Sequence, residues 1–381
     1  MRIGQLSVLP IVFIGLLAGC GQQEQAASGP EVIRIGSVAP LTGAQSHIGK
    51  DNDNGARLAL EEINAQGLVL GGKPIRLELV SEDDAADPKT ATNVAQKLVD
   101  QGVKAVIGHL NSGTTIPASK IYHDAGIPQI SPSATATAYT AQGYNTAYRV
   151  MANDAQQGKA LGQYAVTKLG AKKIAIIDDR TAYGQGLADE FEQAATAAGA
   201  SVVAREYTSD KSADFTAILT SIKGKAADLV FFGGMDPQGG PMVRQMKRLG
   251  LSARLLGGDG LQNINFIQLG AADAEGVVAS SPGLPLDAMP GGAEFKQKFE
   301  ARYGPIQVYA PYAYDAVQIL VAAMRRADSA EPAKVLAELP NTDHAGVTGP
   351  LRFDAKGDTA GGAVTLYQVR NGAWAVLETV Q

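Results

Sequence analysis

From residue 31 to residue 381 the sequence repeats one pattern, in which a short β-rich apolar run is followed by a segment with helical spacing of its apolar residues. In the first copy, residues 32–38 form the run, and Ala56, Leu60 and Ile63 then recur at i, i+4 and i+7. Similar runs occur at 75–79, 103–108, 127–131, 173–177, 228–232 and 254–256. Repeated strand–helix units predict an α/β fold with mostly parallel, doubly wound sheets, whose ligands bind beyond the carboxyl ends of the strands.

The repeating region is too long for a single sheet and its helices. Single hydrophobic cores stop growing at about 250–300 residues, and residues 31–381 exceed that length. We therefore expect two doubly wound α/β lobes. The end of the chain differs, because residues 363–369 and 374–377 flank Asn371-Gly372. That dipeptide is typical of a two-residue hairpin turn, so these runs are expected to pair in antiparallel fashion.

Charge and cysteine content exclude two classes of protein. Lys+Arg number 33 against 38 Asp+Glu, which gives a net charge of −5, and no Lys/Arg-rich run is present. A nucleic-acid partner is therefore not expected. The sequence holds one cysteine, which cannot form an internal disulfide framework.

The N-terminus has the features of a targeting segment. Met1-Arg2 precedes an apolar stretch over residues 6–17, which is too short to span a bilayer. The sequence Leu17-Ala18-Gly19-Cys20 that follows resembles a bacterial lipobox. This resemblance implies a lipoprotein signal peptide over 1–19, a diacylated Cys20 and a flexible tether over 20–30. The alternative is a plain signal peptide in which Cys20 is an ordinary thiol.

A search for catalytic motifs finds no support for an enzyme. The four histidines, at 47, 109, 123 and 344, lack the spacing of metal ligands, and no G-x-S-x-G sequence surrounds a serine. Residues 43–51 do not match a phosphate loop, because Asp51 stands where Ser or Thr must hold Mg²⁺. No G-x-G-x-x-G follows a strand. We therefore expect neither a cofactor nor a metal.

Seven short motifs occur in order along residues 31–381 and together carry a specific resemblance. They are Ala39-Pro40-Leu41-Thr42-Gly43, Glu61-Glu62-Ile63-Asn64-Ala65-Gln66-Gly67, Asp83-Asp84-Ala85-Ala86-Asp87-Pro88, Val106-Ile107-Gly108-His109-Leu110, Ser131-Pro132-Ser133-Ala134-Thr135, Tyr183-Gly184-Gln185-Gly186 and Gly349-Pro350-Leu351-Arg352-Phe353-Asp354. The sequence resembles the leucine/isoleucine/valine-binding proteins, the type I periplasmic substrate-binding components of ABC transporters.

The resemblance implies two lobes joined by a three-stranded hinge that close around an amino acid. The N-terminal lobe is expected to comprise 31–153 with 283–348, and the C-terminal lobe 154–282 with 349–381. The protein is then expected to be a monomer in the periplasm or cell envelope, held at the membrane only by its lipid. Its partners would be the amino acid and the transmembrane subunits of an ABC permease.

In this family, hydroxyl groups bind the carboxylate of the ligand, and the matching residues here are Ser112 and Thr135. A buried carboxylate needs several donors, and a helix that begins near Ser112 would add free N–H groups and a favourable dipole. The alternative for both residues is a simple helix cap.

For the ammonium group, the family pattern implies an acid, here Asp259 between two glycines, and the carbonyl oxygen of Ser133. Tyr183 matches the aromatic residue that covers the ligand, and Tyr309 is a candidate for the side-chain pocket. The competing interpretations are a solvated loop for Asp259, a place on the helix surface for Tyr183 and a core position for Tyr309.

The sequence also departs from the family. A disulfide joins two loops in the well-known branched-chain receptors, and this chain has Ala86 and Asn111 at those positions. Ile48 and Met235 stand where those receptors have pocket tyrosines. An apolar pocket is retained, but its shape changes, which leaves the side-chain specificity open.

Three functions are therefore weighed. The first is a lipid-anchored solute receptor for an aliphatic, branched-chain amino acid. The second is a ligand-sensing protein of the same fold that binds an amide or another small polar molecule. The third is an enzyme, for which Asp83 and Asp84 are the nearest carboxylate pair; adjacent loop acids of this kind are expected to be solvated.

Overall fold

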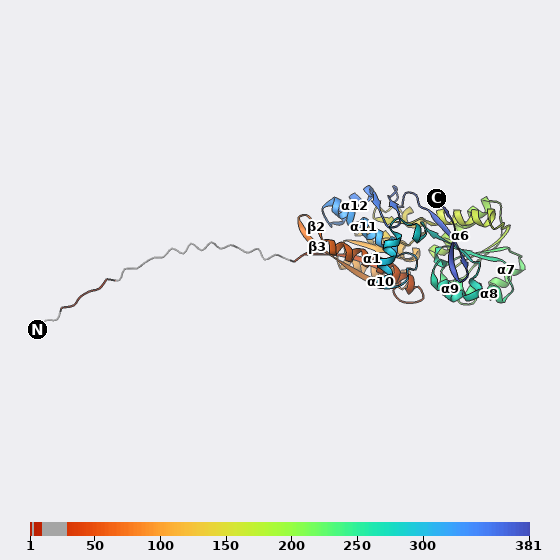
Figure 1. The fold of residues 1–381 in the computed structure, drawn as a ribbon, viewed down its shortest axis with the longest axis horizontal. Coiled ribbons are helices and arrows are strands. Elements are labelled where there is room, and N and C mark those ends of the chain that lie inside the picture. Colours follow the sequence, from red (N-terminus) through yellow and green to blue (C-terminus); the bar gives the residue numbers. More distant parts are fainter. Residues whose placement is uncertain (2–3, 10–28) are drawn as a thin grey trace.

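The computed structural model describes residue 1, residues 4–9 and residues 29–381. The predicted lipidation site, Cys20, lies outside these residues, as does most of the predicted signal peptide and tether. The fold has two α/β parts side by side along its long axis, with α1, α10, α11 and α12 in one and α6 to α9 in the other (Figure 1). The α/β fold with two mostly parallel sheets is confirmed.

The first part is built on a six-stranded sheet in the order β2-β3-β1-β4-β5-β6, parallel except for the β2–β3 pair. Its strands are β1 (Glu31–Ala39), β2 (Leu68–Leu70), β3 (Lys73–Asp83), β4 (Ala105–Gly108), β5 (Gln129–Ser131) and β6 (Ala147–Arg149). Helices from two distant stretches of sequence belong to this part: α1 (Ser46–Gln66), α2 (Pro88–Asp100), α3 (Ser112–Asp124), α4 (Ala138–Ala141), α10 (Gly292–Tyr303), α11 (Ala310–Ala327) and α12 (Pro332–Glu338).

The second part holds a seven-stranded sheet in the order β15-β14-β11-β10-β9-β7-β8. Its strands are β7 (Lys173–Asp178), β8 (Ser201–Tyr207), β9 (Leu229–Gly233), β10 (Arg254–Gly257), β11 (Val278–Pro282), β14 (Val364–Arg370) and β15 (Ala373–Val380). Its helices are α5 (Asp154–Thr167), α6 (Ala182–Ala197), α7 (Thr216–Gly224), α8 (Asp236–Arg248), α9 (Ile264–Gly270) and the 3₁₀ turn η1 (Asp259–Leu261). The predicted C-terminal hairpin is confirmed, since β14 and β15 pair antiparallel and both turn residues, Asn371 and Gly372, have positive φ.

Other short elements complete the chain: η2 (Ala271–Ala274), η3 (Leu286–Ala288), η4 (Leu339–Asn341), and a two-stranded ribbon of β12 (His344–Ala345) and β13 (Pro350–Leu351). The chain passes between the two parts three times, after β6, after β11 and before β14. The lobe boundaries expected from the sequence remain predictions.

Small residues let the first two helices of the second part pack closely. Gly158 and Gly162 lie one turn apart on α5, and a Cβ atom built at either would come within 2.6 Å of an α6 side chain, at Glu190 or Ala194. Larger residues there would force the helices apart. This contact holds α5 against α6, and the first turn of α5 contributes to the site described below.

The two loops that the family disulfide would join are tied by a buried hydrogen-bond chain. His109 Nδ1 lies 2.9 Å from Asp84 Oδ2, and its Nε2 lies 3.0 Å from the Tyr122 hydroxyl. Both Asp84 and His109 are fully buried. The expectation that Asp83 and Asp84 form a solvated loop pair is therefore wrong for Asp84. This residue follows β3 directly and is buried, and its hydrogen bond to His109 offsets the free-energy cost of burying a carboxyl group.

We expect Asp84→Ala to lower the free energy of unfolding by about 1–3 kcal/mol, because it leaves the buried His109 ring nitrogen without a partner. Urea denaturation measures the change. The control is Asp124→Ala, which removes an exposed ion pair with Lys120 and should cost less than about 1 kcal/mol. Equal effects of the two substitutions would contradict a stabilising role for the Asp84–His109 pair.

Candidate functional site

Residues that follow the carboxyl ends of strands in both sheets meet around one small cavity. Ser112 follows β4, Ser133 follows β5 and Asp259 follows β10. The cavity has a volume of about 10 Å³ and is lined by Leu110, Asn111, Ser112, Ser133, Tyr183, Met235, Asp259 and Tyr309. Six of the residues selected from the sequence therefore lie together. Ligand sites typically measure about 300–1,000 Å³, so this is a closed form that must widen to admit a small molecule.

Asp259 is the buried acid of this cavity, with 1% of its surface exposed. Its Oδ1 accepts hydrogen bonds from the Tyr183 hydroxyl at 2.8 Å and from Gln157 Nε2 at 3.1 Å. Its Oδ2 accepts from the Tyr309 hydroxyl at 2.8 Å. Asp259 is thus neither solvated nor paired with a cation among the described residues. The tyrosines hold it in place: the backbone N–H of Gly260 donates to Tyr183 Oη at 2.9 Å.

Burial raises the pKa of Asp259 above its ordinary value, and the hydrogen bonds from Tyr309, Tyr183 and Gln157 oppose that shift. The pKa values of Tyr183 and Tyr309 are raised well above the usual range, chiefly by burial and then by the Asp259 charge. Both tyrosines are therefore neutral donors at physiological pH. A buried carboxyl group whose hydrogen bonds come only from neutral donors favours the binding of a cation.

The opposite wall carries hydroxyl groups. Ser112 is the first residue of α3, and its Oγ accepts from the Ala136 backbone N–H at 3.1 Å. Ser133 Oγ accepts from Asn52 Nδ2 at 2.9 Å. The helix-cap interpretation of Ser112 is not supported, because the N-cap residue of α3 is Asn111. The N-terminus of a helix and two hydroxyls provide a neutral, donor-rich surface for an anion.

Thr135 and Ile48 lie apart from the cavity wall. Thr135 is buried, and its Oγ1 finds no hydrogen-bond partner among the described residues. Ile48 is buried within α1 and packs in the main hydrophobic core. Neither side chain lines the closed cavity, whereas Met235 does.

A fully buried arginine supports the loop that contains Ser133 and Thr135. Arg149 Nη1 donates to the carbonyl oxygens of Ala134 at 3.0 Å and Ala136 at 2.8 Å. Its Nε donates to Asp358 Oδ1 at 2.9 Å. The loop is thereby connected to the third passage of the chain between the two sheets, where Asp358 lies.

Tyr309 is positioned by a second buried acid. The carboxylate of Asp51 accepts the backbone N–H groups of Gln307, Val308, Tyr309 and Ala310 over 2.8–3.1 Å. Two of these donors belong to the start of α11, because Tyr309 is its N-cap residue and Ala310 its first residue. Burial raises the pKa of Asp51, and the four backbone donors oppose the shift. Asp51 and the start of α11 therefore place the Tyr309 hydroxyl on Asp259.

Contacts between the two parts hold the closed form. The Tyr309–Asp259 hydrogen bond joins α11 to the loop after β10. His47 Nε2, on α1, lies 3.2 Å from Asp236 Oδ2, at the start of α8.

Sequence reasoning missed two residues that support the site, Arg149 and Gln157, and one that lies beside it, Asp154. The last two belong to the first turn of α5, where Asn153 forms a capping box with Gln156. The sequence Asn153-Asp154-Ala155-Gln156, which follows β6, is a helix-start signal. It indicates a helix that begins at the strand end, but not which of its side chains reach Asp259.

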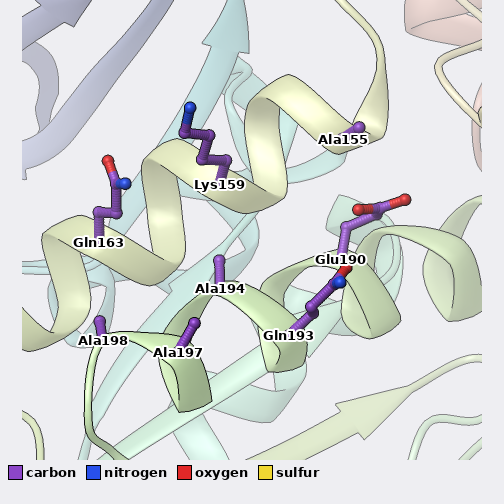
Figure 2. Close-up of a pocket in the computed structure, with 8 residues that line it drawn as sticks. All are labelled: Ala155, Lys159, Gln163, Glu190, Gln193, Ala194, Ala197 and Ala198. Carbon is purple, nitrogen blue, oxygen red and sulfur yellow. The ribbon is translucent and has the colours of Figure 1, made fainter.

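A larger depression lies between α5 and α6, with a volume of about 420 Å³ (Figure 2). Ala194 and Ala197 of α6 face α5, and Lys159 of α5 and Glu190 of α6 also line the depression. It lacks the buried, converging polar groups of a specific site. The Asp259 cavity is therefore the better candidate.

Within the described residues, no three His, Cys, Asp or Glu side chains are grouped to hold a metal ion. No helix in that same part of the chain is both long and apolar enough to cross a membrane.

The chain is similar to known proteins over most of its length. Residues 32–373 match the family model described as periplasmic binding protein. The chain belongs to this family. Its members are solute-binding receptors, and the resemblance inferred from the sequence motifs is confirmed.

Relatives within the family include two proteins of Pseudomonas aeruginosa. An amino acid binding protein is 38% identical over 327 residues, covering 85% of this chain and 86% of the relative. A leucine-, isoleucine-, valine-, threonine- and alanine-binding protein is 35% identical over 353 residues, covering 92% and 93%.

Two solved structures share the family fold. The branched-chain amino acid transporter substrate binding protein LivJ of Streptococcus pneumoniae, in complex with isoleucine, is 31% identical with a TM-score of 0.82 and coverage of 92% and 99%. A solute binding protein of R. palustris in complex with benzoate has a TM-score of 0.81 at 23% identity, with coverage of 91% and 96%. At that identity it shows the fold alone, so the fold does not by itself define the ligand.

Proposed function

We propose that this chain is an extracytoplasmic receptor that binds an aliphatic, branched-chain amino acid between its two lobes and delivers it to an ABC permease. One observation carries the proposal: a buried acid, Asp259, lies across a closed cavity from the hydroxyl-bearing wall of Ser112 and Ser133. An amino acid carries a cation and an anion on adjacent groups, and this arrangement suits both. The names of the relatives support the same ligand class.

The proposed roles follow from the contacts. Asp259 and the Ser133 carbonyl oxygen accept hydrogen bonds from the ammonium group. Ser112 and Thr135 donate to the carboxylate, aided by the N-terminus of α3. Thr135 Oγ1 is buried near the Asp154 carboxyl group without a hydrogen bond of good geometry, so its hydroxyl can turn to the carboxylate of the ligand.

The remaining site residues are assigned to the apolar end of the ligand. Tyr183 and Met235 cover its side chain, and Tyr309 both contacts it and orients Asp259. Ile48 is proposed to join the pocket only after the site widens.

A thermal-shift screen of the mature protein against the amino acids tests this function. A ligand at 100 times its dissociation constant adds about 2.7 kcal/mol of stability. Leucine, isoleucine or valine is expected to give the largest shift. A shift with benzoate or aliphatic amides and none with any amino acid would instead support the sensor of an amide or other small polar molecule.

Opening is required for entry, because the closed cavity measures only about 10 Å³. The proposed ligand groups are divided between the parts, so a ligand that touches both stabilises the closed state. Small-angle scattering should show a smaller radius of gyration when leucine is added. An unchanged profile at saturation would contradict ligand-driven closure.

We further propose that lipid at Cys20 anchors the receptor at the membrane of the cell envelope. Cys20→Ala should then release the protein from the membrane fraction without changing its ligand affinity, because Cys20 precedes β1 by ten residues or more. Fractionation and calorimetry measure the two effects. Wild-type protein found free in the periplasm would exclude the anchor.

A further inference from the structure

A second buried carboxyl group lies near the candidate amine site and has no function in the account above. Asp154, the first residue of α5, has 1% of its surface exposed. Neither of its carboxyl oxygens has a hydrogen-bond partner among the described residues. Buried polar side chains nearly always have partners. Two unsatisfied oxygens on one buried acid therefore point to a group that the protein does not itself supply.

The hydrogen-bonding capacity of Asp259 leads to the same group. An ionised carboxylate has about four lone-pair sites, and Asp259 already accepts from Tyr183, Tyr309 and Gln157. About one site remains, whereas a primary ammonium has three N–H donors. The Ser133 carbonyl oxygen can accept a hydrogen bond from a second N–H of the ammonium, which leaves the third without an acceptor. Asp154 keeps most of its capacity, because the Thr135 hydroxyl lies near it but makes no hydrogen bond of good geometry with either oxygen.

The position of Asp154 agrees with this accounting. Its backbone N–H donates to the carbonyl oxygen of Thr135 at 2.9 Å, so it adjoins the loop proposed to bind the carboxylate. Gln157, one turn further along α5, donates to Asp259. Asp154 thus stands between the two halves of the proposed ligand site.

The charges around Asp154 come from several elements. Burial raises its pKa well above the ordinary value, and the charge of Asp259 raises it further. Glu190 of α6 acts in the same direction, while Thr135 and Arg149 oppose it. Tyr183 and Tyr309 are neutral neighbours whose own pKa values Asp154 helps to raise. A cation that arrives between the two acids would therefore favour the ionised form of Asp154.

We propose that Asp154 is a second acidic contact for the amino group of the ligand, which is then held between the carboxyl groups of Asp154 and Asp259. This rests on the proposed function. Asp154 does not line the closed cavity, so the site must widen toward α5 when the ligand enters. Asp154 then loses its proton to solvent as the ammonium binds.

Calorimetry on the mature protein tests the proposal with two ligands, L-leucine and its amine-free counterpart 2-hydroxy-4-methylpentanoate. Asp154→Asn should weaken leucine binding roughly 10- to 100-fold, and should leave binding of the hydroxy acid within about threefold. The matched control is Asp315→Asn, a buried acid that binds the backbone of Val347 and Thr348. It should leave the ratio of the two affinities unchanged.

Proton exchange provides a second readout that also works on the wild type. Titrations in buffers of different ionisation enthalpy should show proton release on leucine binding, and Asp154→Asn should reduce that release. The role of Asp154 would be overturned if Asp154→Asn weakened the binding of both ligands equally. It would also be overturned if the variant kept the wild-type affinity for leucine and the wild-type proton release. Wild-type protein that binds leucine no better than the hydroxy acid would instead overturn the amino-acid function itself.

Discussion

Asp259→Asn should weaken amino-acid binding by about two to four decades in dissociation constant. The variant leaves the ammonium of the ligand in a desolvated site without its main counter-charge, and breaking one half of a buried ion pair costs about 3–5 kcal/mol. The amide also cannot accept from both tyrosines, since Tyr183 and Tyr309 donate to different carboxylate oxygens. Calorimetry with the ligand identified in the thermal-shift screen measures the loss.

The control for this variant is Tyr183→Phe, which removes one donor to Asp259 and keeps the charge. Its effect should be smaller, about one to two decades, because a single hydrogen bond to a charged group contributes roughly 1.5–3 kcal/mol. An Asp259→Asn protein that binds within a few-fold of wild type would show that the receptor does not recognise an amino group.

The same substitution has an opposite consequence for the ligand-free protein. The folded-state pKa of Asp259 is raised by burial, so its contribution to stability is present below the unfolded pKa and is lost as the pH rises through the folded value. Asp259→Asn removes this loss. Between acidic and neutral pH, the ligand-free variant should therefore lose less stability than the wild type in urea denaturation. An identical pH dependence would contradict the raised pKa.

Residues at strand ends could be predicted from the sequence because the α/β pattern has a rule for them. Ser112, Ser133 and Asp259 each follow a strand, and parallel strands bring their carboxyl ends to one edge. The partners of these residues could not be found in the same way. Gln157 reaches Asp259 across 102 positions of the sequence, and no local pattern specifies which side chain of a helical turn faces which loop.

Burial of individual acids was equally hard to predict. Adjacent aspartates in a loop are usually solvated, yet Asp84 is buried because His109, 25 residues away, supplies a partner. Ile48 shows the opposite difference. It occupies a position that resembles a pocket residue, but its side chain does not line the closed cavity. The sequence pattern predicts in which helix, strand or loop a residue lies, whereas side-chain packing determines which residues line the cavity.

Arg149→Met should lower the free energy of unfolding by about 3–5 kcal/mol, because it removes one half of a buried ion pair. Asp358 would lose the guanidinium that contacts it through two nitrogens. The carbonyl oxygens of Ala134 and Ala136 would lose their donor as well. Because these carbonyls flank Thr135, binding of the carboxylate should also weaken, by about tenfold for one poorly placed donor.

Arg352→Met offers a matched control, because Arg352 also pairs with an aspartate, Asp343, but at the surface, where the two side chains are 66% and 68% exposed. Exposed pairs contribute about 0–1 kcal/mol, so this variant should unfold at nearly the wild-type urea concentration. Arg149→Lys should recover only part of the loss, since a lysine cannot bind two carbonyl oxygens and a carboxylate through the fixed geometry of a guanidinium. If Arg149→Met and Arg352→Met have equal effects on unfolding and on leucine affinity, then Arg149 does not hold the ligand-binding loop to the third passage of the chain.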